Sequence, residues 1–502
     1  MSLTLSCRTF NTLLVAAATL LCANAQARLP LVAEAAQAGD RLDQVYYAQP
    51  HNTYQHSSKL TNWLDAGYRT VELDVIDRGD WEKEAKGPYV SHGASPGNAN
   101  CSAASDDRLG NCLDDVVGWL DRNTANVSVP ILVFVDMKAS WDPASAWKSD
   151  EVATLDDFVR KYLGNRLFTY RDLLATLGAN PNRTGLKATG WPTLATLKGK
   201  IIVVFTGGHL GDVNARMNSA RKILNGQNPA GPVSFLCPDV DSSDPDEISG
   251  AIDSIGATDS AFFFCANMKG GKHDQLVLNR SAEYRQLIHQ WSTAGDFAKT
   301  PEAASDSASY PSSYIAVAHG ASAIGWDVTQ GLSDNSVFQP SWLSSIPLVA
   351  RRRSLPGYFQ LHTPTAGGGK CVDVKGASYK NGTALIQYTC NASAANQQFV
   401  YTAEGQLRPK GDNRYCADID GGKGKQGAKL HIWGCDGGES ERWAVTPDGR
   451  FANRHGDWRF CMDLLNADPA DGAPLVLWPC NAADAAQKFD PQAVPEWNQT
   501  VF

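Results

Sequence analysis

The chain has 502 residues, a formal net charge of −8, and a composition that is 43% hydrophobic and 20% charged. This length predicts two or three domains, and the composition is that of an ordinary globular protein rather than a disordered chain. The acidic balance argues against a nucleic-acid partner, since no basic block extends beyond Arg351-Arg352-Arg353.

The N-terminus has the pattern of an export signal. Arg8 precedes the apolar run LLVAAATLLCA, and Ala23-Asn24-Ala25 supplies the small residues of a cleavage site. We therefore expect residues 1–25 to be a signal peptide that is cleaved near Ala25. The mature protein is then expected to be secreted, either extracellular or periplasmic, and monomeric.

Residues 38–346 alternate between apolar runs and longer amphipathic stretches. Near-continuous apolar strands separated by helices predict a parallel sheet that is buried on both faces. No glycine-rich nucleotide fingerprint is present, and the length favours a closed TIM-like β/α barrel. The predicted strands lie in residues 44–50, 68–75, 131–138, 200–207, 261–268 and 314–328, and helical stretches include 154–164 and 281–292.

Polar residues recur where these predicted strands end, which is where barrel enzymes place their chemistry. Asn52, Glu72, Asp74 and Asp136 offer only oxygen ligands, and such a set suits a hard cation, calcium better than zinc. The sequence therefore predicts a Ca²⁺ site with charge to spare for an anionic phosphate.

Two histidines and a lysine accompany the acidic set. His51 and His92 can act as charge stabiliser and proton donor, and Lys138 can contact a phosphoryl oxygen. Together with the metal site, these groups predict cleavage of a phosphodiester.

The ordered motifs HNTY, ELD, SHG and VDMK resemble the X-region of calcium-dependent phosphatidylinositol-specific phospholipase C in its compact bacterial form. The resemblance implies that His51 and His92 are catalytic, that Asn52, Glu72, Asp74 and Asp136 bind calcium, and that Lys138 binds the substrate phosphate. It further implies that a phospholipid or another membrane-surface phosphodiester is cleaved to diacylglycerol and a cyclic inositol phosphate. Asp136 stands where the family often has Glu, and Pro50 stands where it often has Ser.

Two other functions remain open. A glycerophosphodiester or sphingomyelin phosphodiesterase shares the barrel and an ELDV…HG pattern, but it normally begins with His-Arg-Gly rather than His-Asn-Thr-Tyr. The second alternative is a carbohydrate-binding lectin with an inert barrel.

Cysteine spacing reveals an internal repeat near the C-terminus. Cys371, Cys416 and Cys461 are 45 residues apart, and each precedes a second cysteine by 19 residues. The predicted disulfides are Cys371–Cys390, Cys416–Cys435 and Cys461–Cys480, with local pairs Cys101–Cys112 and Cys237–Cys265.

Three units with short strands and no helical pattern predict an all-β fold with pseudo-threefold symmetry. The CVDV, CADI and CMDL motifs, with the closures NQQF, SERW and AQKF, resemble the ricin B-type β-trefoil lectin family over residues 357–492. The remaining residues 347–356 are expected to form a linker.

In that family an Asp, an aromatic platform and a closing amide pair hold a sugar, so a glycan partner is implied. The third repeat keeps Asp463 and Trp478 but has Ala486 where Asn is expected. The residues that the resemblance assigns to carbohydrate binding are Asp373, Tyr388, Asn396 and Gln397 in the first repeat and Asp418, His431 and Trp433 in the second.

Overall fold

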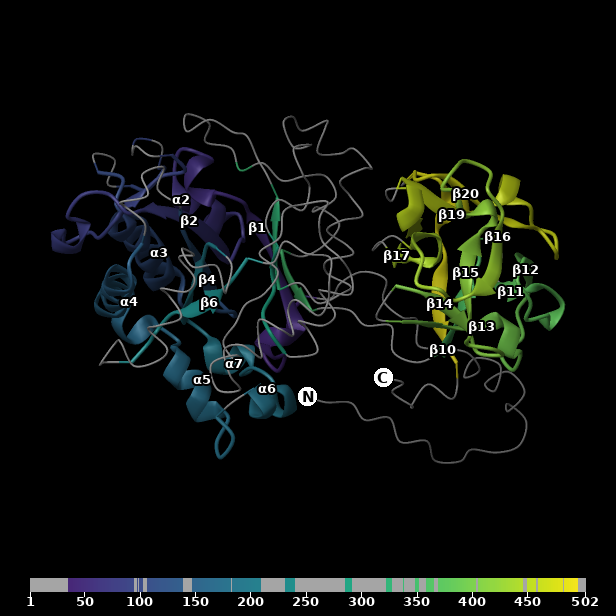
Figure 1. Cartoon of the computed structure of the whole chain (residues 1–502), viewed down its shortest axis with the longest axis horizontal. Coiled ribbons are helices and arrows are strands. Elements are labelled where there is room, and N and C mark those ends of the chain that lie inside the picture. Colours follow the sequence, from purple (N-terminus) through teal and green to yellow (C-terminus); the bar gives the residue numbers. More distant parts are fainter. Residues whose placement is uncertain are drawn as a thin grey trace, which may run out of the picture.

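The computed structural model describes residues 35–93, 97, 99–102, 106–138, 147–181, 183–208, 231–239, 285–290, 322–326, 337, 348–351, 358–364, 369–402, 405–445, 449–456, 459–481 and 483–494. Figure 1 shows an N-terminal α/β lobe, with elements up to β9, and a separate all-β lobe that follows it. The predicted signal peptide and the predicted strand 261–268 lie outside the described residues. Within these ranges, no helix has the length and apolar character needed to cross a membrane.

The strands of the α/β lobe form two sheets, in the orders β3-β2-β4-β5-β6 and β7-β8-β1-β9. The pairs β2–β4, β4–β5, β5–β6, β7–β8 and β1–β8 are parallel, whereas β3 and β9 pair in the antiparallel sense. The strand bounds are β1 Val45–Pro50, β2 Thr70–Ile76, β3 Tyr89–Val90, β4 Ile131–Met137, β5 Ile201–Thr206, β6 Phe235–Cys237, β7 His289–Gln290, β8 Ala323–Trp326 and β9 Val349–Arg351.

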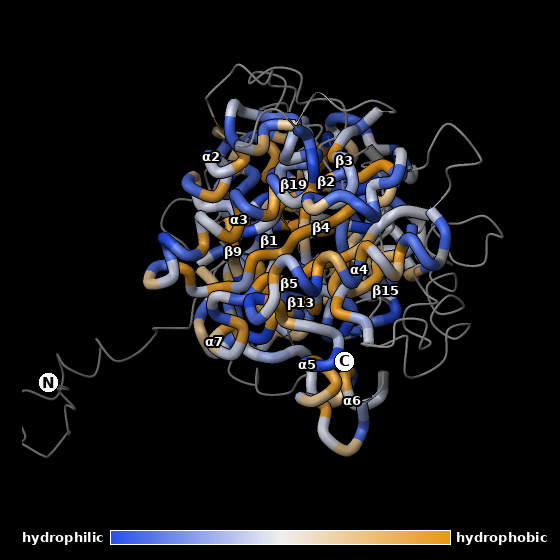
Figure 2. The backbone as a smooth tube through the Cα atoms, turned by 90° about the vertical axis from the view of Figure 1, so that its left-hand side faces the viewer, coloured by the Kyte–Doolittle hydropathy of each residue, from blue (hydrophilic) through white to orange (hydrophobic). Residues whose placement is uncertain are grey.

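Side chains alternate along these strands between two apolar cores. Val71, Val133 and Val203 face one core, which also contains residues of the neighbouring helices, while Leu132 and Ile202 face the other. Burial on both faces explains why the strands read as continuous apolar runs. In Figure 2, β1 and β4 appear as strongly hydrophobic strands.

Both sheets contribute to the second core. Val45 of β1, Phe134 of β4 and Ala323 of β8 belong to it. Thr70 Oγ1 donates a hydrogen bond of 2.9 Å to the carbonyl of Ala48, so β1 lies beside β2. Within the described strands, however, no ladder joins β1 to β2 or β6 to β7. The parallel α/β architecture is therefore observed, and closure into a TIM-like barrel remains a prediction.

Helices cover the outer face of the β2–β4–β5 sheet. The amphipathic α3 and α4 bury residues such as Leu113, Val116 and Val159 against it. Thr169 caps α5, because its Oγ1 accepts a hydrogen bond of 3.2 Å from the amide of Asp172. The helix bounds are α2 Leu60–Asp65, α3 Leu109–Asn123, α4 Ser149–Leu163, α5 Tyr170–Thr176, α6 Arg183–Thr189 and α7 Leu194–Leu197.

Two segments differ from the expectations. The stretch 281–292 was expected to be helical, but its residues His289–Gln290 form β7 beside β8. Leu287 and Ile288 are fully or almost fully buried, so burial on both sides favours a strand over an amphipathic helix. Within the expected linker 347–356, Val349–Arg351 form β9 and pair with β1, so the α/β lobe continues to at least Arg351.

The C-terminal lobe repeats one hairpin three times. The hairpins β11–β12, β15–β16 and β19–β20 share the same register, with the first cysteine of each repeat opposite the aromatic residue: Cys371 opposite Tyr388, Cys416 opposite Trp433 and Cys461 opposite Trp478. Their apolar residues meet in a single core around Trp443. The strand bounds are β10 Tyr358–His362, β11 Lys370–Val374, β12 Thr383–Thr389, β13 Gln398–Tyr401, β14 Leu407–Pro409, β15 Tyr415–Ile419, β16 Leu430–Gly434, β17 Trp443–Val445, β18 Phe451–Asn453, β19 Phe460–Leu464, β20 Leu475–Pro479 and β21 Asp490–Ala493.

The structure contains the three predicted repeat disulfides and Cys101–Cys112. Cys237 is buried at the end of β6. Its predicted partner Cys265 lies outside the described residues, so that pair stays a prediction.

Candidate functional site

The turn after β1 places His51 and Asn52 beside Glu72 of β2. Asn52 adopts a left-handed conformation (φ 51°, ψ 50°), which Asn tolerates better than most residues. Thr53 fixes the turn, because its Oγ1 donates to the carbonyl of Pro50 (2.7 Å) and accepts from the amide of Glu72 (3.1 Å).

Three carboxylates lie on β2 and β4: Glu72 and Asp74 lie within β2, and Asp136 lies near the carboxyl end of β4. Asp74 is directly opposite Asp136 in the parallel register, and Glu72 is opposite Phe134. Because Phe134 belongs to the core shared by both sheets, these carboxylates occupy the same face of the sheet as that core. The β4 carboxylate predicted from sequence thus lies next to the β2 pair.

Lys138 extends between two of these carboxylates. Its Nζ lies 2.7 Å from Asp136 Oδ2 and 3.1 Å from Asp74 Oδ2. Burial disfavours the charge of Lys138, but the carboxylates of Asp136 and Asp74 more than offset this and raise its pKa. Burial raises the pKa of Asp74 to about 7, although Lys138 opposes that shift.

The donor set fits a hard divalent cation. Glu72, Asp74 and Asp136 outnumber the single ammonium of Lys138, so the ionised cluster has an excess of two negative charges. The Oδ1 atoms of Asn52 and Asp74 are buried and accept no hydrogen bond from the described residues. Buried oxygens without donors are unfavourable unless a ligand satisfies them, and oxygen-only sets of this kind suit calcium.

The three carboxylates do not converge on one point in this structure. Among the described residues, three ligand atoms come within 4.8 Å of one another only in His362–Cys371–Cys390 and Cys416–Cys435–Glu441. Both sets contain disulfide-bonded cysteines, which are not available as thiolate ligands. The prediction of a metal at the acidic set therefore depends on its chemistry and its buried oxygens.

Of the two predicted catalytic histidines, His51 lies beside this cluster. His51 Nε2 is 3.9 Å from Glu72 Oε1. His92 follows β3 and is exposed. Partial burial, then the positive charges of Lys138 and His51, lower the pKa of His92. These influences place His92 within electrostatic reach of the same site.

Sequence reasoning missed three residues of this site. Gln49 Nε2 donates to Glu72 Oε2 (2.9 Å) and lies 2.8 Å from His289 Nε2, while Tyr54 donates to Asp74 Oδ2 (2.9 Å). His289 is fully buried and stacks on Phe134, with 4.1 Å between ring centroids. Burial lowers the pKa of His289 to about 4. The motif QPHNTY contains Gln49 and Tyr54, so inspecting it further could have found both, whereas His289 comes from a distant segment.

The first trefoil repeat holds its predicted sugar residues together. Asp373 Oδ2 accepts hydrogen bonds from Asn396 Nδ2 (2.8 Å) and Gln397 Nε2 (2.9 Å), and Tyr388 is 47% exposed. A fixed carboxylate and an exposed ring are the groups that can hold sugar hydroxyls and a sugar face.

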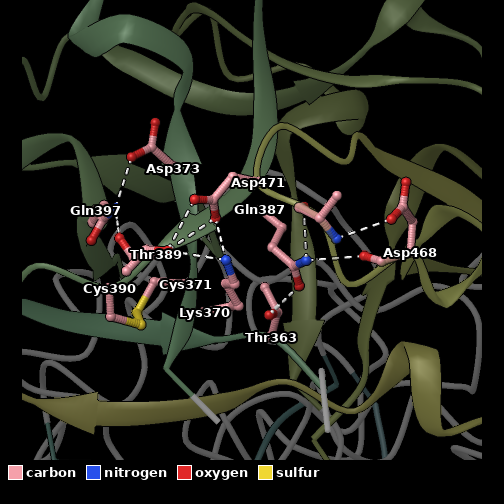
Figure 3. Close-up of polar contacts among 11 residues, drawn as sticks. Thr363, Lys370, Cys371, Asp373, Gln387, Thr389, Cys390, Gln397, Asp468 and Asp471 are labelled. Carbon is pink, nitrogen blue, oxygen red and sulfur yellow. Dashed lines mark hydrogen bonds and ion pairs between the residues drawn. A yellow bond between two sulfur atoms is a disulfide. The ribbon is translucent and has the colours of Figure 1, made fainter. Parts of the chain in front are cut away.

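At the open end of this hairpin, the paired residues Lys370 and Thr389 contact Asp471 of the third repeat. Figure 3 shows these contacts beside Gln387, which donates to the carbonyl of Asp468. The hairpin of the first repeat is therefore tied to the third repeat.

The second repeat has a different polar arrangement. Glu441 replaces the closing amide and accepts from the amides of Asp436 and Gly437, so it has no hydrogen to donate to Asp418 when ionised. Asp418 accepts instead from the amide of Ile419 (2.6 Å). His431 lies opposite Asp418 and stacks on Trp433, with centroids 5.5 Å apart.

The third repeat keeps part of the pattern. Gln487 Nε2 donates to Asp463 Oδ2 (3.0 Å), and Trp478 is 37% exposed. Ala486 cannot provide the second amide that Asn396 supplies in the first repeat. The three potential sugar sites are thus unequal.

Comparison with known proteins bears on both lobes. Residues 358–489 match the family model of the ricin-type beta-trefoil lectin domain, so this part of the chain is a β-trefoil of that type. A comparison with curated protein sequences found no match.

Solved structures with similarity to the chain include calcium-dependent phosphoinositol-specific phospholipase C from Pseudomonas sp. (19% identity, 64% of this chain and 99% of that chain, TM-score 0.45). Another is the Ca²⁺-dependent phosphatidylinositol-specific phospholipase C of Streptomyces antibioticus (19% identity, 62% and 99%, TM-score 0.44). A third is the C-terminal half of the earthworm R-type lectin in complex with GalNAc (20% identity, 27% and 98%, TM-score 0.23).

Proposed function

We propose that the protein is a secreted calcium-dependent phosphodiesterase of the phospholipase C type, acting on phosphatidylinositol or a related inositol phosphodiester. One observation carries this proposal: residues from three separate motifs lie beside one another on β2, on and just after β4, and in the turn after β1. These residues are His51, Asn52, Glu72, Asp74, Asp136 and Lys138. The motif resemblance to the X-region of that enzyme family supports it.

Binding of the substrate would use charges that the site already holds. Asn52, Glu72, Asp74 and Asp136 are the residues proposed to hold calcium, which when bound would neutralise phosphate charge and lower the pKa of an attacking hydroxyl. Lys138 offers an ammonium to a phosphoryl oxygen, and His51 lies next to the same cluster.

The attacking group in an inositol lipid can be the ring hydroxyl next to the phosphate. Such an intramolecular attack has a large entropic advantage, with effective molarities of about 10⁵–10⁸ M in well-oriented models. The hydroxyl oxygen forms a new bond to phosphorus, its proton passes to a carboxylate of the acidic set, and the bond to the diacylglycerol oxygen breaks. The organic product is then a cyclic inositol phosphate.

His92 is proposed to protonate the departing diacylglycerol oxygen. Its lowered pKa keeps it neutral in the free protein at neutral pH. A bound phosphodiester brings negative charge, which favours the protonated form of a nearby imidazole. Substrate binding would therefore convert His92 into the acid that the leaving group needs.

The trefoil is proposed to attach the enzyme to glycan-bearing surfaces. The ordered Asp373 site supports this role, and the earthworm relative is a lectin in complex with GalNAc. The four disulfides of the described residues favour an oxidising compartment, in accord with the proposed export.

Phosphorus NMR of early reaction mixtures tests the proposal. The protein is incubated with phosphatidylinositol, sphingomyelin or glycerophosphodiesters, with calcium or with chelator. We expect a cyclic inositol phosphate from phosphatidylinositol when calcium is present and none when chelator is present. The His51→Ala and His92→Ala variants should lose most of the reaction rate while keeping the circular dichroism spectrum of the wild type.

Other products would favour the alternatives. Choline phosphate or glycerol phosphate without a cyclic phosphodiester would replace this proposal by the phosphodiesterase alternative. Absence of turnover on every substrate, with glycan binding intact, would favour a lectin with an inert α/β lobe. Full activity in chelator would remove the calcium assignment.

A further inference from the structure

Glu72 and Asp74 each have one oxygen that is held by protein donors and one that is not. Glu72 Oε2 accepts from Gln49 Nε2 (2.9 Å) and from the amide of Asn52 (3.2 Å). Asp74 Oδ2 accepts from Tyr54 Oη (2.9 Å) and contacts Lys138 Nζ (3.1 Å). The same division occurs in two carboxylates two residues apart.

The opposite oxygens are left open toward a ligand. Asp74 Oδ1 is buried and accepts no hydrogen bond from any described residue, and the same holds for Asn52 Oδ1. Glu72 Oε1 lies 3.9 Å from His51 Nε2, a distance that is too long for a hydrogen bond. One oxygen from each of three residues is therefore available to an ion.

We propose that Gln49 and Tyr54 are positioning residues that present Glu72 and Asp74 to calcium through one oxygen each. This inference rests on the proposed function, because it needs calcium at the acidic set. Without the two donors, Glu72 Oε2 would keep the amide of Asn52 and Asp74 Oδ2 would keep Lys138, so each carboxylate would be held by one partner instead of two and would rotate more easily about its last bond.

Both positioning residues are themselves held firmly. Gln49 is buried and is the last residue but one of β1. It lies on the same face of the strand as Val45 and Tyr47, which belong to the second core. Its amide nitrogen must donate to the carboxylate of Glu72, and its second N–H can donate to His289 Nε2, 2.8 Å away. The amide is thus locked between an acidic and a neutral acceptor.

Tyr54 is buried in the turn that follows the HNT motif. The carbonyl of Tyr54 accepts the amide of Asn100 (2.7 Å), and Asn100 Nδ2 also donates to the carbonyl of Thr53 (3.0 Å). The adjacent Cys101 is bonded to Cys112 of α3. The disulfide therefore anchors the segment that supports Tyr54.

Isothermal titration of purified, calcium-free full-length protein with CaCl₂ tests the inference. Tyr54→Phe and Gln49→Met remove the two donors with little change in volume. We expect each to weaken calcium binding by about 10–100-fold, the range for groups that orient metal ligands. Turnover should return toward the wild-type value when calcium is raised to saturate the variant.

Tyr47→Phe is the matched control. Tyr47 lies on the same strand and is buried, and its hydroxyl has no hydrogen-bond partner among the described residues. We expect it to bind calcium like the wild type. Melting temperatures in chelator show whether each variant remains folded.

The outcomes separate this inference from the proposed function. If the wild type binds calcium and both variants bind it equally well, the positioning role is wrong and the proposed function stands. An equal loss in Tyr47→Phe would show general loosening of the strand and would also overturn it. If the wild type binds no calcium, both the inference and the calcium-dependent function fail.

Discussion

Single residues of the α/β lobe combine burial with charge. Asp74 is fully buried beside Lys138 and Tyr54, and Glu72 is held by Gln49. Such buried polar groups stabilise the fold only while every partner is in place, because a lost partner leaves a desolvated charge or donor. The site is therefore sensitive to changes one contact away from the predicted catalytic groups.

His289 predicts a pH dependence of stability. Its pKa is lowered to about 4 by burial, below the ordinary value of roughly 6.5. A lowered pKa means that its contribution to stability is present above about pH 6.5 and is lost as the pH falls toward 4. By this linkage the loss amounts to roughly 3 kcal/mol.

The variant His289→Gln isolates this effect. Gln can accept the hydrogen bond from Gln49 but does not titrate. We expect the wild type to lose more melting temperature than the variant between pH 7 and pH 4.5, measured in chelator. Identical shifts in the two proteins would mean that His289 does not titrate with folding.

At the level of elements, the three hairpins of the trefoil use different polar contacts on one backbone. Gln397 and Gln487 each donate to the Asp of their own repeat, whereas Glu441 occupies the corresponding place in the second repeat. Burial raises the pKa of Glu441, so its ionised form is unfavourable in the folded state. The second repeat therefore has a carboxylate at the position where the other two repeats have an amide.

Glu441→Gln should stabilise the trefoil at neutral pH. A raised folded-state pKa means that the contribution of Glu441 is greatest at low pH and is lost as the pH rises. Gln retains the acceptor and adds a donor for Asp418, which we expect to contribute about 1 kcal/mol. The gain in melting temperature should be larger at pH 7 than at pH 4, and a gain that is equal at both would contradict the explanation.

Gln387 offers a second test at this scale. It is fully buried, accepts from Thr363 Oγ1 (2.6 Å) and donates to the carbonyls of Asp468 and Ala470. Gln387→Leu should destabilise the trefoil by roughly 1–3 kcal/mol, because these groups lose their partner. Asp471→Asn is the matched comparison, since it weakens a more exposed tie between the same two repeats and should cost much less. Chemical denaturation measures both.

At the scale of the whole molecule, each lobe has its own core and its own disulfides. Separate cores are the usual basis for independent folding. A lectin lobe would raise the local concentration of the enzyme at a glycan-bearing surface without altering its chemistry.

Deletion of residues 357–502 should therefore leave activity on a soluble inositol phosphodiester within about twofold, since the proposed catalytic residues all precede residue 139. Attachment to glycan-bearing cells or polysaccharide should be lost. Pull-down with immobilised polysaccharide, alongside the soluble assay, measures both effects. Equal attachment with and without the trefoil would contradict the targeting role.

Features that depend on a local pattern could be predicted from the amino-acid sequence. Apolar runs predicted β1, β2, β4 and β5, and the 45-residue cysteine period predicted three all-β repeats and their disulfides. These features are readable because strand burial and disulfide loops each leave a regular spacing along the chain.

Contacts between residues that are distant along the chain become known from the three-dimensional fold. The region of β7 reads as an amphipathic stretch, and only its position beside β8 and Phe134 makes it a strand with a buried histidine. Gln49 and Tyr54 read as ordinary residues until their hydrogen bonds to Glu72 and Asp74 are known. These hydrogen bonds join residues that are 20 or more positions apart, and such contacts produce no periodic pattern in the sequence. They could not be predicted because the packing of distant segments sets them, whereas helix and strand periodicity is local.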